Sequence, residues 1–178
     1  DPAVAFSSGG RTLNFTIPAN ATDAQLPAGF AMQTGTVSGE IKLALTLRAG
    51  GNDITPSPAP TVVGRVAKAA PVVRSVTARR VAGGLEVVIT GFSTSRDINS
   101  ATFRFSPAPG SSLQTSELTV QLGEGARGWY QSEASRPFGS QFKLTQQFNV
   151  QGDTSAIASV SVTLTNAEGT SASSSANF

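Results

Sequence analysis

The sequence predicts an all-β protein built as two tandem β-sandwich domains, and three observations carry this prediction. Apolar and polar residues alternate over many short stretches, which is the period of a half-buried β-strand. Turns rich in glycine, proline and serine separate these stretches at short intervals, and no helix is expected. Only 13% of the 178 residues are charged. This composition suits neither a disordered chain nor a membrane span.

Strand signals in the first part of the chain are sparse. Short strands are expected over residues 3–6 and around residues 13–17, and the clearest alternation runs over residues 36–48. The apolar face of that stretch consists of Ile41, Leu43, Leu45 and Leu47. A glycine turn at 50–53 and a proline run follow, and residues 61–66 are interpreted as an edge strand.

The domain boundary is placed at a linker over residues 67–71, because an earlier cut would separate the valines of 62–66 from the first sheet. Residues 1–66 are then predicted to be a small β-sandwich domain. A single core is marginal at this size. We therefore expect this unit either to lean on its neighbour or to lack strands that precede Asp1.

Residues 72–178 are predicted to form a second sandwich of seven to eight strands. A strand through Val81, a turn at Gly83 and Gly84 and an alternating stretch over 85–90 predict a β-hairpin. Further strands are expected over 101–105, 118–122 and 142–150, with a closing hairpin over 159–178. Residues 123–128 are interpreted as a turn that leads into a strand with Trp129 and Tyr130.

Two stretches of this second unit carry a family resemblance. The segment VTLTNAEGTSASS at 162–174, taken with PVVRSVTARRVAGGLEVVITGFS at 71–93, resembles the last and first strand pairs of bacterial immunoglobulin-like or fibronectin-III-like sandwich modules. In the first unit, LNFTIPANA and QTGTVSGEIKLALTL look like another β module found beside these in large secreted bacterial proteins. The resemblance implies a spacer, adhesive unit or accessory domain, and it transfers no catalytic residue.

The composition excludes several kinds of chemistry. The chain has no cysteine and no histidine. Disulfides, thiolate chemistry, the Ser-His-Asp triad and the usual zinc sites are therefore ruled out. A glycosidase would need two of the eleven acids to face each other across a cleft, but these acids are interpreted as solvated. We expect no enzyme activity, no cofactor, no metal site and no catalytic residues.

Calcium and nucleic acid are two further candidate ligands. Oxygen-rich turns occur around Asp53, Asp97 and Asp153, but no spaced acidic set is present, so hydrogen-bonded Asx turns are the preferred interpretation. A basic stretch over residues 65–80 lacks interleaved aromatics or a recognition helix, so no nucleic-acid partner is expected. No apolar run is long enough to span a membrane.

The adjacent pair Trp129 and Tyr130 provides the binding candidates, because they are the only Trp and the only Tyr of the chain. Neighbouring strand residues point to opposite faces, so one of the two would be a partly exposed aromatic, able to stack on a sugar ring or anchor a protein. The alternatives are a core Trp with a surface Tyr, or both side chains packed under the loop at 136–138.

The sequence thus predicts a non-catalytic extracytoplasmic module, secreted, on the cell surface or periplasmic, that serves as a structural spacer or adhesive unit of a larger bacterial protein. Its partners would be other domains of that parent protein, together with a polysaccharide or a surface protein if it is adhesive. The alternative is a carbohydrate- or protein-binding accessory domain that uses an exposed aromatic. A carboxylate-based hydrolase ranks third.

Overall fold

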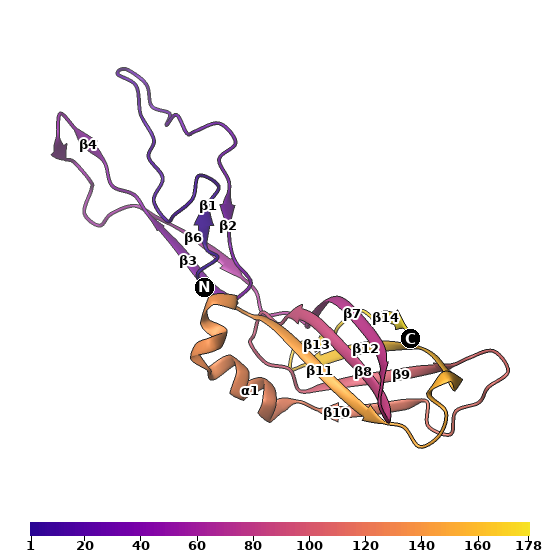
Figure 1. Ribbon diagram of the computed structural model, residues 1–178. Coiled ribbons are helices and arrows are strands. Elements are labelled where there is room, and N and C mark those ends of the chain that lie inside the picture. The colour runs from indigo at the N-terminus through magenta and orange to yellow at the C-terminus, as the bar shows by residue number, and fades with distance from the viewer.

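The computed structural model describes residues 1–178, and most of its regular structure is β-strand. Residues 72–178 form two antiparallel sheets, from which residues 1–66 extend as a slender projection (Figure 1). The helix α1 lies beside the junction of the two parts, close to the N-terminus (Figure 1). The predicted all-β class is confirmed. No helix is long and apolar enough to cross a membrane.

Two sheets make up the larger part. The three-stranded sheet has the order β11-β8-β7 and consists of β7 (Val72–Val81), β8 (Gly84–Phe92) and β11 (Gln141–Asn149). The second sheet has the order β10-β9-β12-β13, and β14 also pairs with β12. Its strands are β9 (Ser100–Pro107), β10 (Glu117–Gln121), β12 (Ile157–Asn166), β13 (Gly169–Thr170) and β14 (Ser174–Asn177).

The hydrophobic core lies between these two sheets. Alternate residues of β8, β9 and β12 point inward, so that Ile89, Phe103 and Val162 are completely buried. Phe148 of β11 meets Phe103 edge to face, with ring centroids 4.9 Å apart. Burying each large apolar side chain contributes about 1.5–3 kcal/mol. The alternation in the sequence therefore identified the correct inward face.

The closing hairpin is present, but its return strand is broken into β13 and β14. The strand β12 lies between β9 and these two short strands, whereas β14 pairs only with β12. Phe178 holds the end of the return strand against the sandwich. Its backbone N–H donates to Ala158 O at 3.0 Å, and its ring stacks on Phe105. The predicted edge position of the return strand is therefore confirmed.

The expectation of no helix is wrong at one place in the sandwich. Residues expected to form a turn and a strand instead form α1 (Gly123–Gln131), followed by the 3₁₀ helix η1 (Glu133–Phe138). Leu122, Ala126, Trp129 and Tyr130 recur at helical spacing and pack against the core. The three glycines within this helix disfavour it locally, by about 1 kcal/mol each. Burial of its apolar face therefore stabilises the helix. A second 3₁₀ turn, η2 (Thr154–Ala156), precedes β12.

Residues 1–66 contain three separate two-stranded sheets. They pair β1 (Ala5–Phe6) with β2 (Met32–Gln33), β3 (Gly39–Ala44) with β6 (Thr61–Val66), and β4 (Arg48–Ala49) with β5 (Asn52–Asp53). The predicted sandwich is not confirmed here, because none of these residues is buried. The strand expected over 13–17 is reduced to a single bridge between Thr16 and Gln25. A two-stranded ribbon lacks a second layer against which to bury its apolar face.

Candidate functional site

The helices α1 and η1 place both aromatic binding candidates at the junction between the projection and the sandwich. Neighbouring residues on a helix are separated by about 100° around its axis, so both side chains can lean toward the sheets. Tyr130 is 6% exposed, whereas Trp129 is half-buried. A core Trp with a surface Tyr is therefore not what the structure shows. The two residues divide into a buried anchor and a partly exposed ring.

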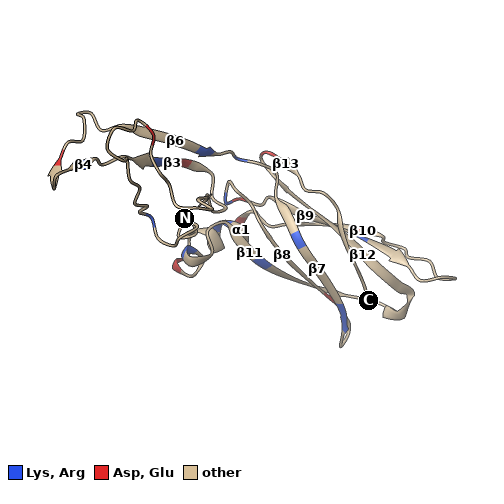
Figure 2. Ribbon diagram, turned by 90° about the horizontal axis from the view of Figure 1, so that it is seen from above, with Lys and Arg blue, Asp and Glu red and all other residues tan.

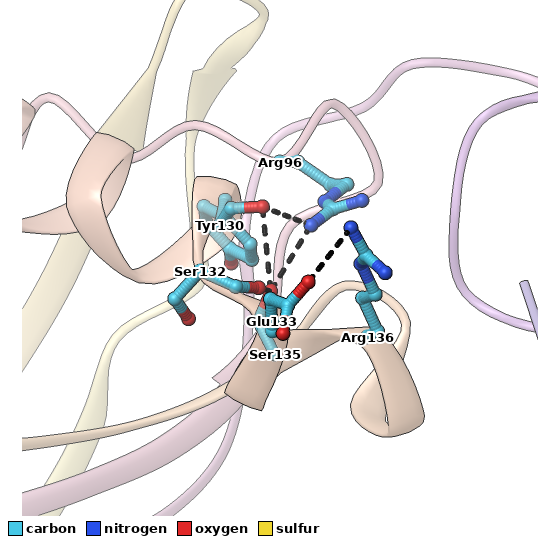
Figure 3. Close-up of polar contacts among 6 residues, drawn as sticks. All are labelled: Arg96, Tyr130, Ser132, Glu133, Ser135 and Arg136. Atoms are coloured by element: carbon cyan, nitrogen blue, oxygen red, sulfur yellow. Dashed lines mark hydrogen bonds and ion pairs between the residues drawn. The ribbon is translucent and has the colours of Figure 1, made fainter.

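Tyr130 is held by hydrogen bonds at both ends. Its hydroxyl donates to Ser140 O at 3.0 Å, and its backbone carbonyl accepts from Arg96 Nη2 and from Ser135 Oγ (Figure 3). The guanidinium of Arg96 also lies 5.6 Å from the centroid of the Tyr130 ring. Burial raises the pKa of the Tyr130 hydroxyl, because the charged phenolate loses its hydration there.

Arg96 adopts an unusual backbone conformation at this site. Its φ is +57°, in the left-handed region that L-residues rarely occupy. Arg96 N donates to Ser93 O at 2.8 Å, and its side chain crosses to the Tyr130 carbonyl and to Ser135 Oγ (Figure 3). Such strain persists only where the surroundings over-determine the conformation. Here the contacts of Arg96 join the loop after β8 to the helices.

A small polar pocket opens beside this arginine. Its volume is about 280 Å³, and its polar lining includes Arg96, Asp97, Asn99 and Arg127. Asp97 is already engaged by Ser95 Oγ, whereas Arg127 is exposed and has no ion-pair partner. The pocket therefore presents the free guanidinium of Arg127 and the side-chain amides of Asn99 and Gln131 to small polar molecules.

Ser140 connects the helical insert to the projection. Its Oγ donates to Thr36 O at 2.6 Å, and its backbone N–H donates to Thr36 Oγ1 at 3.1 Å. Since Ser140 O accepts from the Tyr130 hydroxyl, a continuous chain of hydrogen bonds runs from Tyr130 through Ser140 to Thr36. Ser140 is completely buried and Thr36 is half-buried, so the bonds between them are partly shielded from water.

The carboxylate of Asp1 binds the segment around Thr36, which contacts Ser140. It accepts hydrogen bonds from the backbone N–H groups of Thr36 at 2.7 Å and Val37 at 3.1 Å. Gly139, with φ of +62°, lies against this carboxylate, and a Cβ there would come within 2.8 Å of Asp1 Oδ2. The backbone conformation at position 139 therefore favours glycine, and the Asp1 carboxylate would have to shift to admit a Cβ there.

A second contact joins the two parts next to the first one, since Ser93 N, one residue before Thr94, donates to Ser140 O at 3.1 Å. Ser38 N donates to Thr94 O at 2.8 Å, and Ala69 N donates to Thr94 Oγ1 at 2.9 Å. Asn166, at the end of β12, donates to Ala69 O at 2.9 Å and to the hydroxyls of Ser93 and Ser95. These contacts could not be predicted from the sequence, because isolated short polar residues carry no signal for partners as far as 97 positions away in the chain.

Trp129 forms the exposed part of the site together with Phe138 of η1. Their ring centroids lie 6.1 Å apart and the rings are tilted by 33°. Phe138 is 52% exposed, whereas the indole N–H of Trp129 donates to Gln141 O at 3.0 Å. The alternative in which both side chains pack under the loop at 136–138 agrees with the structure for Trp129, whose ring lies beside Phe138. The exposed ring of Phe138 leaves an aromatic surface open to solvent.

The acids are dispersed over the structure (Figure 2). Glu40, Glu86, Glu117 and Glu133 each form an ion pair with an arginine. Asp53 and Asp153 accept from the backbone N–H two residues later, which is the predicted Asx-turn arrangement. No group of three or more metal-ligating side chains occurs.

Comparison with known protein families, with curated proteins and with solved structures found no match.

Proposed function

We propose that this chain is a non-catalytic, extracytoplasmic spacer module of a larger bacterial protein, in which the junction holds the projection at a defined angle to the sandwich. The observation that carries the proposal is the pair of hydrogen-bonded contacts across the junction, one through Thr36 and Ser140 and one through Ser38 and Thr94. A rigid spacer fixes both the distance between the domains that it connects and their relative orientation. Two adjacent contacts, made by residues 36 and 38 to two paired segments of the sandwich, restrict bending in a way that a flexible linker cannot.

The strand order supports an immunoglobulin-like or fibronectin-III-like assignment for residues 72–178. Two antiparallel sheets of this size, with crossovers between them, are the architecture shared by such modules. The order departs from the constant-type immunoglobulin domain, whose fourth strand joins the sheet of the first two. Here the fourth strand, β10, pairs with β9 instead. Cell-surface modules commonly use this architecture, which agrees with the expected extracytoplasmic location.

The proposal predicts that the two parts tumble as one body. Backbone ¹⁵N relaxation should give the same rotational correlation time for amides in β3 and in β8. Ser140→Ala should separate the two values, because it removes the hydrogen bond from Ser140 Oγ to Thr36 O. Ser75→Ala is the matched control, since it removes an exposed hydroxyl pair with Thr90 inside one sheet. Independent tumbling in the unaltered chain would rule out a rigid spacer.

The aromatic pair Trp129 and Phe138 favours a second candidate function, the binding of a polysaccharide or a surface protein. Half-exposed aromatic rings next to each other offer a flat apolar surface on which a sugar ring can stack. Titration of tryptophan fluorescence with a panel of polysaccharides tests this function. Saturable quenching lost in Phe138→Ala but kept in Tyr130→Phe would support it, since the Tyr130 ring is buried. A flat response across the panel would leave only the spacer.

A further inference from the structure

A groove runs along the projection between two extended segments. One bank is formed by residues 12–17, and the other by residues 44–49, which continue from β3 into β4. The groove has a volume of about 740 Å³, and most of the residues that line it are hydrophobic. Its size falls in the range of roughly 300–1,000 Å³ that is common for ligand sites.

Both banks present unpaired backbone groups. The N–H groups of residues 12–15 donate to no other residue, and the same is true of the N–H of Thr46. On the second bank, Leu45 N and Leu47 N turn the other way, toward Pro60 O and Thr55 Oγ1. Because N–H groups alternate along an extended chain, Thr46 N faces the free edge. The two banks therefore resemble two strands with an unoccupied position between them.

The side chains follow the same pattern as the backbone. Leu13 and Phe15 on one bank, and Leu45 and Leu47 on the other, are half-buried at alternate positions. Ile17 and Ile54, which also line the groove, are 43% and 56% exposed. A strand placed between the banks would join these separate apolar rows into one face. It would also enlarge the marginal two-stranded sheet of β3 and β6.

A positive charge, that of Arg48, lies at one end of the groove. Arg48 is the only charged residue of the lining, and it has no ion-pair partner. Asp53 stands opposite it across the hairpin of β4 and β5 and attracts it electrostatically, but the two side chains do not form an ion pair. A carboxylate on the bound molecule would complement the free guanidinium of Arg48.

We propose that this groove binds an extended peptide segment of another protein, with apolar side chains at alternate positions and a carboxylate at the end beside Arg48. The peptide inserts as a strand between residues 12–17 and 44–49. Its backbone pairs with the free N–H and C=O groups of both banks, which is the β-strand addition mode of peptide recognition. The alternate apolar side chains provide the specificity, and the ion pair sets the direction of the strand.

The test uses the full ¹⁵N-labelled chain and the synthetic peptide acetyl-Thr-Val-Thr-Val-Thr-Val-Asp-amide. The amide resonances of residues 12–15 and of Thr46 should shift saturably, with a dissociation constant below about 1 mM. The amides of Leu13, Phe15 and Thr46 should gain protection from hydrogen exchange, because Thr16 N points toward Gln25 and the N–H groups alternate along the chain. A peptide with proline in place of the central valine should bind at least about tenfold more weakly, because proline cannot donate to the ladder.

Two charge variants distinguish an effect of Arg48 at the groove from a general effect of the net charge on peptide binding. Arg48→Glu should weaken binding at least about tenfold, and aspartate-to-lysine exchange in the peptide should restore part of the loss. Arg127→Glu changes the net charge equally but lies in the sandwich, so it should leave binding unchanged. The proposal is overturned if these amides show no saturable shift, or if the proline peptide binds equally well. Concentration-dependent dimerisation of the chain alone, with the same amides protected, would assign the groove to a second copy and also overturn it.

Discussion

Ser140 and Thr36 exchange two hydrogen bonds although they lie 104 positions apart in the chain. The backbone N–H of Ser140 donates to Thr36 Oγ1, and Ser140 Oγ donates to the Thr36 carbonyl. Because Ser140 is fully buried and also binds the Tyr130 hydroxyl, this pair connects the projection to the core of the sandwich.

A double-mutant cycle on Ser140→Ala and Thr36→Val should reveal coupling between the two residues. Each substitution removes one hydrogen bond, which contributes about 0.5–1.5 kcal/mol to stability. Residues in direct contact couple by about 0.5–3 kcal/mol, whereas distant sites are additive. Chemical denaturation monitored by circular dichroism measures the four stabilities. Strict additivity would show that the two bonds do not act together.

Gly139→Ala should disrupt the junction more than a glycine substitution elsewhere. A Cβ at this position meets Asp1 Oδ2 at 2.8 Å and Thr36 Oγ1 at 2.9 Å, and the backbone conformation, with φ of +62° and ψ of −111°, costs a residue with a Cβ about 1–3 kcal/mol. Gly110→Ala has a similar φ of +78° but open space around it, so it isolates the conformational cost. The loss in melting temperature should be larger for Gly139→Ala. Equal losses would mean that Asp1 is not held at this place.

Alkaline titration of the single tyrosine reports on the buried end of the junction. Burial raises the pKa of Tyr130, so its phenolate absorbance should appear only well above the ordinary pKa of about 10. The folded state holds the proton more tightly than the unfolded state does. The protonated Tyr130 hydroxyl therefore contributes to the free energy of unfolding. This contribution is fully present below about pH 10 and is lost as the pH rises through the folded pKa.

Tyr130→Phe keeps the ring but removes the hydroxyl, and it should lower stability by about 1 kcal/mol. The variant should also lose the alkaline dependence between pH 10 and the folded pKa of Tyr130, since it no longer titrates. Both effects can be followed by urea denaturation at a series of pH values. An ordinary titration near pH 10 in the unaltered chain would contradict the buried position of Tyr130.

Acid should weaken the sandwich through Glu86. The hydrogen bond from Arg79 Nε, at 2.6 Å, and a second one from Gln147 lower the pKa of this carboxyl. Stability from this group is present above its unfolded pKa of about 4.3 and is lost as the pH falls through the lower folded value. Glu86→Gln should flatten the acid limb of the stability profile. Glu117→Gln, in an exposed pair with Arg104, is the control and should change the profile less.

Removal of residues 174–178 should destabilise the sandwich. The deletion strips β14 from β12 and exposes Phe105, on which the Phe178 ring stacks at 6.4 Å. Phe178→Ala alone should cost about 2 kcal/mol, less than a fully buried phenylalanine, because Phe178 is only half-buried. Thermal unfolding measures both variants. An unchanged melting temperature would contradict the role of this edge.

The alternation of apolar residues in the sequence was sufficient to predict the strands of the sandwich. Leu85, Val87 and Ile89 all lie in the core, and the turn before them uses Gly83 with φ of +76°. The period of two along a strand is a local property, so it can be recognised without knowing the partner strand. The strand β12 shows the same alternation, whereas the return strand after Gly169 consists of small residues without it.

Only the tertiary structure decided the rest. The helix α1 contains three glycines, and the burial of Tyr130 and its neighbours stabilises it against that local preference. The alternation over residues 36–48 predicted a strand that the structure limits to Gly39–Ala44, and it did not predict that this strand would lack a second layer to cover it. The junction of Asp1, Thr36 and Ser140 depends on three short polar side chains. Such side chains pair with whatever the fold brings near them, so sequence alone determined the strands and the fold determined which polar groups meet.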